Sequence, residues 1–207
     1  NPKTGESTHF RASGKSTDIA YPNVHGLLAL GDTLLVGTFE HELDMLNIRT
    51  GKVFAHYPSQ NKSQILRSNF MVTFCHSRSG STYVGTRLGL YQFWSHNGTF
   101  KAILPQLSNA FIHTLMEDRD STCWIDKMGS GLYRYNPDTK QLDHWVHHSN
   151  LTKSLPNNWI TTLFQDSNGS MWIGTEGGGL CRLRTDKTGF DQYTTDNGPP
   201  CNTVYKI

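Results

Sequence analysis

Short apolar runs separated by turn residues recur along this chain, and the pattern is fullest from Ser167 to Leu180, which reads SNGSMWIGTEGGGL. Asn168-Gly169 favours a type I′ hairpin turn, because both central residues of that turn need positive φ. Met171 to Thr175 form a short apolar run typical of a strand. The three glycines at 177–179 let the chain reverse again. The pattern predicts a module of turn, strand, turn and strand.

The end of this strand has counterparts earlier in the chain. Ile173-Gly174-Thr175 matches Val36-Gly37-Thr38, Val84-Gly85-Thr86 and, in altered form, Ile125-Asp126-Lys127. The central residues of these triplets are 48, 41 and 48 residues apart. One four-stranded propeller blade needs about 40 to 50 residues. The repeat predicts an all-β fold, a β-propeller array of four complete four-stranded antiparallel blades with partial blades at both ends, cut from a larger propeller.

Strand patterns and turn signals divide the chain into blades. The inner strands are almost continuously apolar, as in Phe70–Phe74, because neighbouring blades cover both faces of the sheet. The first ten residues resemble Asn136–Trp145, which indicates the outer strand of a preceding blade. We therefore expect the sequence to begin inside a repeat. The predicted segments are an outer strand at 1–14, blades at 19–58, 69–104, 110–148 and 158–194, and the inner strand of a next blade at 201–207.

Large rings and small residues are expected at the contacts between blades. Trp124, Trp172 and Tyr83 occupy equivalent positions, where one ring can wedge between two sheets. The glycines of the repeated triplets would let a neighbouring strand approach closely. Asn69, Asn158 and Asn202 each precede an inner strand and are interpreted as caps that hold the crossover loop.

Charge and cysteine usage exclude several classes of partner. The net charge is +2 with both signs interspersed, which argues against a nucleic-acid or anionic-membrane partner. No stretch approaches the roughly 20 apolar residues of a membrane span, and the first residues lack a signal peptide's apolar segment. We expect any targeting or membrane segment to lie outside this sequence. The spacing of Cys75, Cys123, Cys181 and Cys201 fits neither a zinc site nor a redox motif, so buried free thiols are the preferred interpretation and the disulfide state stays open.

Two stretches resemble a known family. Asp166–Thr175, followed by Gly178-Gly179-Leu180, resembles the two-component regulator propeller repeat. Glu117–Ile125 with Gly131–Asn136 is a second match, and the first two blades match more loosely. The chain departs from the repeat at Asp126-Lys127, where a charged pair replaces the usual Gly-Thr.

The resemblance implies a sensory role. Family members of this kind are extracytoplasmic sensor regions of hybrid two-component regulators from bacteria that degrade polysaccharides. The segment would be non-catalytic and periplasmic, within a protein anchored in the inner membrane. It would contribute to a receptor for glycan-derived oligosaccharides, which relays the signal to a histidine kinase and a transcriptional response elsewhere in the protein.

Candidate ligand residues follow the second strand of each blade, where loops of neighbouring blades emerge on one face. These residues differ between blades while the scaffold repeats, as a recognition surface would, although solvated loops also vary freely. The candidates are Phe39, Glu40, His41, Arg87, Lys127 and Glu176.

No catalytic, metal or cofactor site is predicted. His144 and His148 on one strand would stand about 13 Å apart, too far to chelate one ion. Glu117–Asp120 is interpreted as a hairpin turn in which Asp118 bonds nearby backbone amides. No nucleophile with its base and no dinucleotide-binding glycine loop is present in the sequence. The alternatives kept open are a propeller lyase or hydrolase acting on polysaccharide, and a protein-interaction scaffold.

An incomplete ring also predicts association. Two blade faces would be uncovered and would expose more apolar surface than monomers usually tolerate. We expect self-association of open arcs, or dependence on the remaining blades and C-terminal domains of the same protein.

Overall fold

The chain forms four antiparallel sheets of four strands, seen in a computed structural model that describes residues 3–5, 7–39, 41, 43–57, 66–68 and 70–207. Each sheet lies within one of the predicted blade ranges and is called blade 1 to blade 4. The strands are β1 (Val24–Leu30), β2 (Thr33–Thr38), β3 (Leu43–Asn47) and β4 (Lys52–Tyr57) in blade 1; β5 (Met71–His76), β6 (Thr82–Thr86), β7 (Gly89–Trp94) and β8 (Thr99–Ile103) in blade 2; β9 (Ile112–Glu117), β10 (Cys123–Lys127), β11 (Leu132–Tyr135) and β12 (Leu142–Trp145) in blade 3; and β13 (Ile160–Gln165), β14 (Met171–Thr175), β15 (Leu180–Leu183) and β16 (Phe190–Tyr193) in blade 4.

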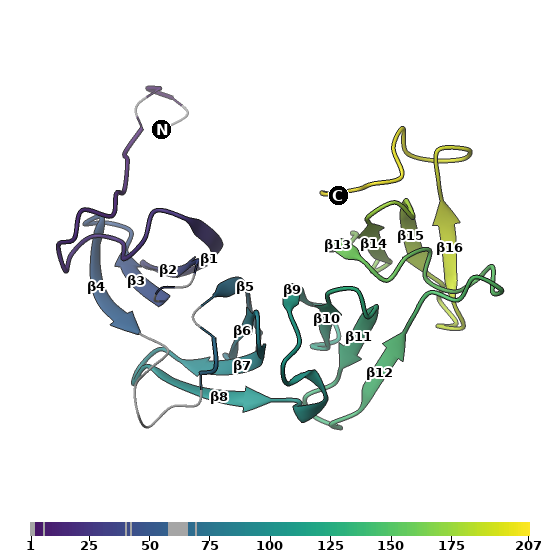
Figure 1. Ribbon diagram of the computed structural model, residues 1–207, viewed down its shortest axis with the longest axis horizontal. Coiled ribbons are helices and arrows are strands. Elements are labelled where there is room, and N and C mark those ends of the chain that lie inside the picture. Colours follow the sequence, from purple (N-terminus) through teal and green to yellow (C-terminus); the bar gives the residue numbers. More distant parts are fainter. Residues whose placement is uncertain (1–2, 6, 40, 42, 58–65, 69) are drawn as a thin grey trace.

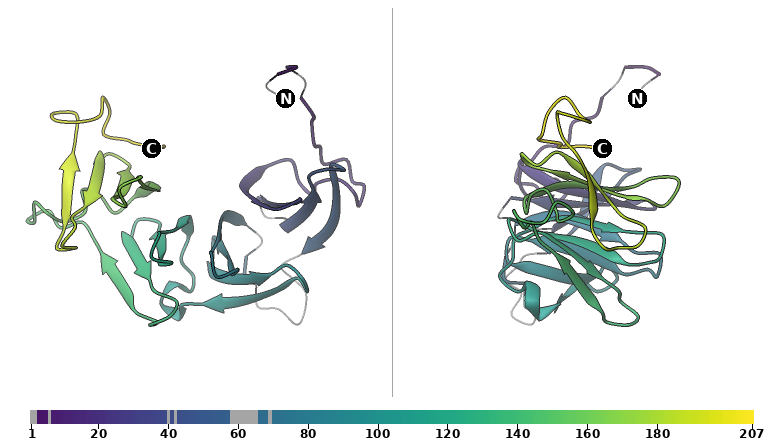
Figure 2. Two further views of the ribbon diagram at one scale, coloured as in Figure 1. Left: turned by 180° about the vertical axis from the view of Figure 1, so that it is seen from behind. Right: turned by 90° about the vertical axis from the view of Figure 1, so that its right-hand side faces the viewer.

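The sheets are arranged as an open arc (Figure 1). Within each sheet, strands consecutive in sequence are hydrogen-bonded neighbours. The first strand of each blade lies toward the centre of the arc and the fourth on its outside, and both chain ends lie on the open side (Figure 1). The view from behind shows the same arc of sheets (Figure 2). The predicted all-β propeller fold is confirmed.

Helical structure is limited to one 3₁₀ turn in the described part of the chain, η1 (Pro105–Leu107), between blades 2 and 3. No helix there is long and apolar enough to cross a membrane.

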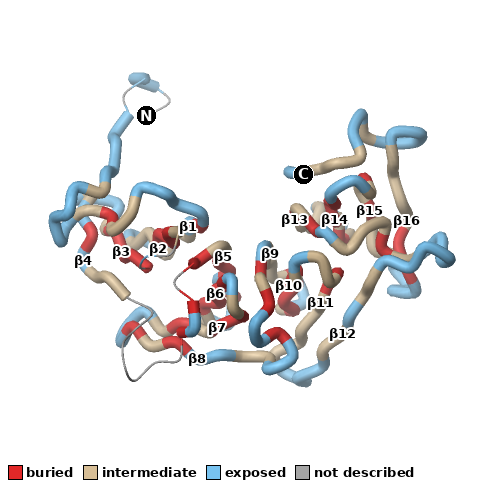
Figure 3. The backbone as a smooth tube through the Cα atoms, in the orientation of Figure 1, coloured by how far each residue is buried: buried red, intermediate tan, exposed pale blue. Residues whose placement is uncertain are grey.

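The core lies between the blades, as expected when sheets cover one another face to face. Buried residues gather inside the sheets and exposed ones at the loops (Figure 3). One cluster joins blades 1 and 2, a second joins blades 2 and 3, and a third joins blades 3 and 4. Trp124 is 2% exposed and belongs to the third cluster, so its predicted place between two blades is confirmed. Trp172 is only partly buried, because it lies on the face of blade 4 that no described blade covers.

Glycine is required where blades meet most closely. A Cβ added at Gly37 would lie 2.7 Å from the Met71 Cβ of the next blade, and one at Gly85 would lie 2.7 Å from Ile112. Cβ atoms do not approach to that distance, so the backbones could not pack as they do with a larger residue. The predicted close approach is confirmed at both positions.

Asparagine caps link successive blades. Asn158 Oδ1 accepts a hydrogen bond from the His147 amide at 2.6 Å, and Asn202 Oδ1 accepts one from the Thr195 amide at 2.8 Å. The Asn158 and Asn202 carbonyls in turn accept from the Gly131 and Gly179 amides at 3.1 and 2.6 Å. The capping interpretation is therefore confirmed for both asparagines, whereas Asn69 lies outside the described residues.

The two partial blades are not strands in the structure. The described residues before Val24 form no strand, and their one backbone bond to a sheet runs from the Val53 amide of β4 to the Thr17 carbonyl at 2.8 Å. An outer strand needs the other strands of its own blade as hydrogen-bond partners. The C-terminal segment lies against blade 4: the Val204 amide donates to the Thr175 carbonyl at 3.1 Å, and the Thr161 hydroxyl donates to the Val204 carbonyl. Its assignment as the inner strand of a further blade stays a prediction.

Candidate functional site

One backbone hydrogen bond repeats at the same place in every blade and defines a ring of equivalent positions. The amide just after the second strand donates to the carbonyl just before the first strand, at 2.9 Å for Glu176 to Trp159. The same bond measures 2.9 Å in blade 1, 3.2 Å in blade 2 and 3.0 Å in blade 3. Because the inner strands line the centre of the arc, these positions form a rim around its axis (Figure 1). This axial rim consists of Asn23, Phe39, Phe70, Arg87, Phe111, Met128, Trp159 and Glu176.

Three of the predicted candidates, Phe39, Arg87 and Glu176, are equivalent rim residues. His41 lies beside the rim and stacks on Tyr21 with ring centroids 4.1 Å apart. Glu40 lies outside the described residues. These placements bring three candidates to one face.

Lys127 does not occupy the place that the sequence suggested. It pairs with Ile112 inside β10, as Thr86 pairs with Met71 and Thr175 with Ile160. The equivalent of Arg87 in blade 3 is therefore Met128, whose amide makes the repeated bond. Asp126-Lys127 takes the place of Gly-Thr in blade 3, so the residue just past that pair is Met128 and not Lys127.

Aromatic side chains connect the rim from blade to blade. Phe39 and His25 each lie edge-on to Phe70, with ring centroids 4.7 Å apart, and Phe70 lies 5.7 Å from Phe111. His113 follows at 6.4 Å from Phe111. The rings come from blades 1, 2 and 3, so they form a chain of aromatic contacts across two blade contacts, in which Phe70 is buried.

Trp159 is the most exposed aromatic residue of the rim. Its side chain is 46% exposed, and it borders a shallow hollow of about 270 Å³ together with Glu176. Asn157 fixes this pair: its amide nitrogen donates to the Glu176 carbonyl at 2.7 Å, and its Oδ1 accepts from the Trp159 amide at 2.9 Å. The indole also covers Gly129, where an added Cβ would lie only 3.4 Å from the ring. Asn157 thus fixes the backbone of both residues, and an exposed aromatic residue and an acidic residue border one hollow.

Sequence reasoning missed the aromatic part of the rim. Phe70, Phe111 and Trp159 were not among the predicted candidates. The shared signal is that each immediately precedes the first strand of its blade.

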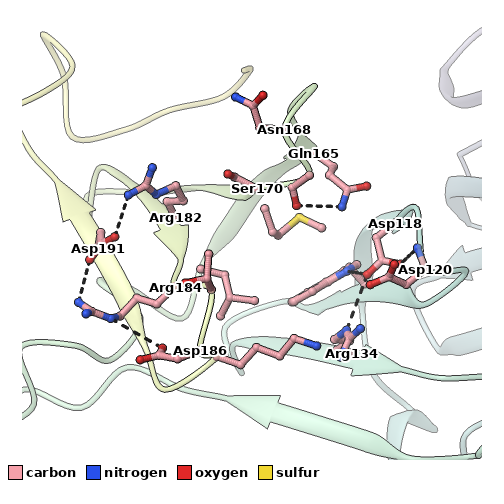
Figure 4. Close-up of a pocket in the computed structure, with 16 residues that line it drawn as sticks. Asp118, Asp120, Arg134, Gln165, Asn168, Ser170, Arg182, Arg184, Asp186 and Asp191 are labelled. Atoms are coloured by element: carbon pink, nitrogen blue, oxygen red, sulfur yellow. Dashed lines mark hydrogen bonds and ion pairs between the residues drawn. The ribbon is translucent and has the colours of Figure 1, made fainter.

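A second hollow, of about 400 Å³, lies at the opposite end of the strands between blades 3 and 4 (Figure 4). Most of its charged side chains are paired with one another. Asp191 accepts from Arg182 Nη2 and Arg184 Nη1, both at 3.0 Å, and Arg134 Nε lies 3.7 Å from Asp118 Oδ2. Four basic and four acidic side chains line it, so it has no net charge to attract an ion.

The remaining histidines considered as ligands are engaged in local contacts. His144 stacks on Tyr133 at 3.9 Å and bonds the Ser130 carbonyl, and His147 Nδ1 bonds the Leu155 carbonyl at 2.7 Å. Within the described residues no group of three His, Cys, Asp or Glu side chains is arranged to hold a metal ion.

Comparison with known proteins agrees with the repeat. The family model described as "Two component regulator propeller" matches residues 154–177, which include Trp159 and Glu176. The chain carries a two-component regulator propeller repeat. No curated protein sequence matches the chain.

Two similar solved structures are extracellular domains from one organism. The extracellular domain of a putative hybrid two-component system from B. thetaiotaomicron matches all of the chain at 19% identity, with a TM-score of 0.80 over 27% of that domain. The extracellular domain of a putative one-component system from the same organism matches 89% of the chain at 25% identity, with a TM-score of 0.71 over 24% of it. The chain thus spans about a quarter of the length of these domains.

A propeller enzyme is also similar in fold. Virginiamycin B lyase from Staphylococcus aureus matches 83% of the chain and 55% of its own length at 11% identity, with a TM-score of 0.60. At that identity the likeness concerns the fold alone.

Proposed function

We propose that this chain is a non-catalytic, ligand-sensing segment of the periplasmic domain of a hybrid two-component sensor. Its ligand would be an oligosaccharide derived from a glycan, bound at the axial rim. Kinase activity and the transcriptional response would belong to other parts of the same protein. The propeller repeat and the likeness to extracellular domains of putative one-component and hybrid two-component systems support the sensory part of this proposal.

The pairing of Trp159 with Glu176 carries the ligand part. An exposed aromatic ring can stack against the apolar face of a pyranose, and a neighbouring carboxylate accepts hydrogen bonds from sugar hydroxyls. Loops on a rigid scaffold are where binding residues concentrate. The rim combines these features on one face, and 46% exposure leaves the Trp159 ring accessible.

Relay to a kinase requires that ligand binds two arrangements of the domain with different affinity. Rim residues come from all four blades, so a ligand that spans them senses how blades sit relative to one another. Binding at the rim can therefore bias domain geometry without any chemical step.

The test is calorimetry of the chain against a panel of plant, host and microbial oligosaccharides. For the saccharide that binds, Trp159→Ala should weaken affinity by about 2 kcal/mol, roughly 30-fold in Kd. Phe164→Ala is the matched control, because Phe164 is on β13, the strand that directly follows Trp159, is 42% exposed and lies away from the rim.

Two results would count against the proposal. Equal loss in both variants would show a general effect on blade 4 rather than a rim site. No heat with any saccharide, together with recovery of a protein partner, would favour the scaffold alternative.

A further inference from the structure

The middle of the second strand is glycine in three blades and aspartate in one. Gly37, Gly85 and Gly174 occupy equivalent positions, and Asp126 takes this position in blade 3. In blades 1 and 2 the glycine lies directly against the first residue of the next inner strand. Asp126 therefore places a carboxyl group at the contact between blades 3 and 4, called here the 3–4 seam.

The Asp126 carboxyl is enclosed and unsatisfied. Its side chain is fully buried, at 0% exposure, and neither Oδ1 nor Oδ2 has a hydrogen-bond partner among the described residues. His113 Nδ1 is 4.0 Å from Oδ2, beyond hydrogen-bond distance, and the His113 side chain is 42% exposed. An ionised carboxylate without donors is costly in such a place.

The surrounding strands offer few groups to compensate a charge. On β9 the ionisable residues are His113 and Glu117, and on β10 they are Cys123 and Lys127. Strand β11 carries Tyr133, Arg134 and Tyr135, and β13 of the next blade carries none. Among these, only His113 lies within 4.0 Å of the carboxyl. Burial accordingly raises the pKa of Asp126 to about 8.

We propose that the 3–4 seam is a proton-linked hinge, in which Asp126 is uncharged while the seam is closed and releases its proton to solvent when the seam opens. The rim crosses this seam, with Phe111 and Met128 on one side and Trp159 and Glu176 on the other. Opening would change the spacing of these pairs. The hinge thus supplies a means by which the rim's geometry responds to proton activity.

The direction of the effect follows from linkage. An aspartate in the unfolded chain has a pKa near 3.9, far below the value in the closed seam. Between these values the folded chain binds more protons than the unfolded one, so the contribution to stability is present at low pH and is lost as pH rises through about 8.

The experiment compares wild type with Asp126→Asn, which keeps the shape and cannot ionise. Denaturation midpoints are measured at pH values from about 5 to about 9, and the difference between the two proteins is followed. We expect wild type to lose stability relative to Asp126→Asn steadily from about pH 5, because the unfolded chain is ionised there and the closed seam is not, and the loss should level off above about pH 8. A constant difference across the range would overturn the proposal.

A local readout separates the seam from the whole fold. At pH 9, amide exchange in β13 should be faster in wild type than in Asp126→Asn, while exchange in β5 should be equal in both. Asp126→Gly, which restores the residue of the other blades, serves if the asparagine variant does not fold. Equal β13 exchange in wild type and variant would also reject the hinge, and neither measurement depends on a sugar ligand.

Discussion

Trp124 donates its indole N–H to Asp118 Oδ2 at 2.8 Å, and this bond ties the second strand of blade 3 to the turn that precedes it. Asp118 Oδ1 also accepts from the amides of Asp120 and Thr122, at 2.9 and 3.0 Å. Blade 4 repeats the arrangement with Trp172 and Asp166, whose indole bond is again 2.8 Å. One carboxylate therefore holds both the hairpin turn and the large ring.

Asp118→Ala should destabilise the chain strongly. Asp118 is 3% exposed, and its removal leaves three donors without their acceptor, two of which, the Thr122 amide and the Trp124 indole, are buried. Such donors cost about 1 to 3 kcal/mol each, and partial rescue by water brings the expected total to about 3 to 5 kcal/mol. Denaturant titration of the wild type and the variant measures this loss of unfolding free energy. Asp166→Ala, at a more exposed copy of the same turn, should cost less, and an equal cost at both sites would contradict the role of burial.

The hydrogen bond from Trp172 should lower the measured pKa of Asp166. The indole N–H of Trp172 is the main cause that holds the pKa of Asp166 below its ordinary value, with backbone amides adding to it. Because the folded pKa is lowered, this group contributes stability above the unfolded pKa, and the contribution is lost as pH falls through the folded value. Trp172→Phe should raise the pKa of Asp166 toward the ordinary range. Carboxyl NMR titration of the wild type and the variant checks this.

Local sequence was enough to predict the framework but not the rim. The turn at Asp118 was predicted because hairpin chemistry depends on residues close in sequence, and the bonds to Asp120 and Thr122 confirm it. The contacts of Phe70 with Phe39 and Phe111 join three blades, and an apolar residue at a strand start is equally compatible with the core. The departure at Asp126 was visible in the sequence, yet its enclosure depends on how blade 4 packs.

Gly85→Ala should disturb the contact between blades 2 and 3. The new methyl would lie 2.6 Å from Thr73 Cγ2 and 2.7 Å from Ile112 Cγ2, and Ile112 is fully buried. Overpacking of this kind costs about 1 to 3 kcal/mol. Thermal denaturation gives the shift, and the exposed Ser95→Ala is the control. Unchanged stability would mean that the two blades adjust more freely than their packing suggests.

Only one thiol should react in the native chain. Cys75, Cys123 and Cys181 are buried free thiols, and burial raises the pKa of Cys75 to about 11 and of Cys123 to about 12. Burial also raises the pKa of Cys181. Because the thiolate is the reactive form, iodoacetamide at neutral pH should modify Cys201 alone. Mass spectrometry should show one adduct in native chain, none in Cys201→Ser and four after denaturation of the wild type.

Self-association remains a prediction, and the structure indicates which residues on the two end faces of the arc would take part. Leu27 on β1 is 61% exposed, and Phe164 on β13 is 42% exposed. Leu28 and Leu163, their neighbours in sequence, pack into the contacts between blades, so alternation turns Leu27 and Phe164 to the free faces of blades 1 and 4. Light scattering should show mass that rises with concentration, because apolar faces of this kind pair with one another. Phe164→Asp should reduce that rise, whereas Asn168→Asp, at an exposed turn of the same blade, should not. A wild-type chain that stays monomeric at all concentrations would show that these faces are tolerated in water, and then the remaining blades would not be needed to cover them.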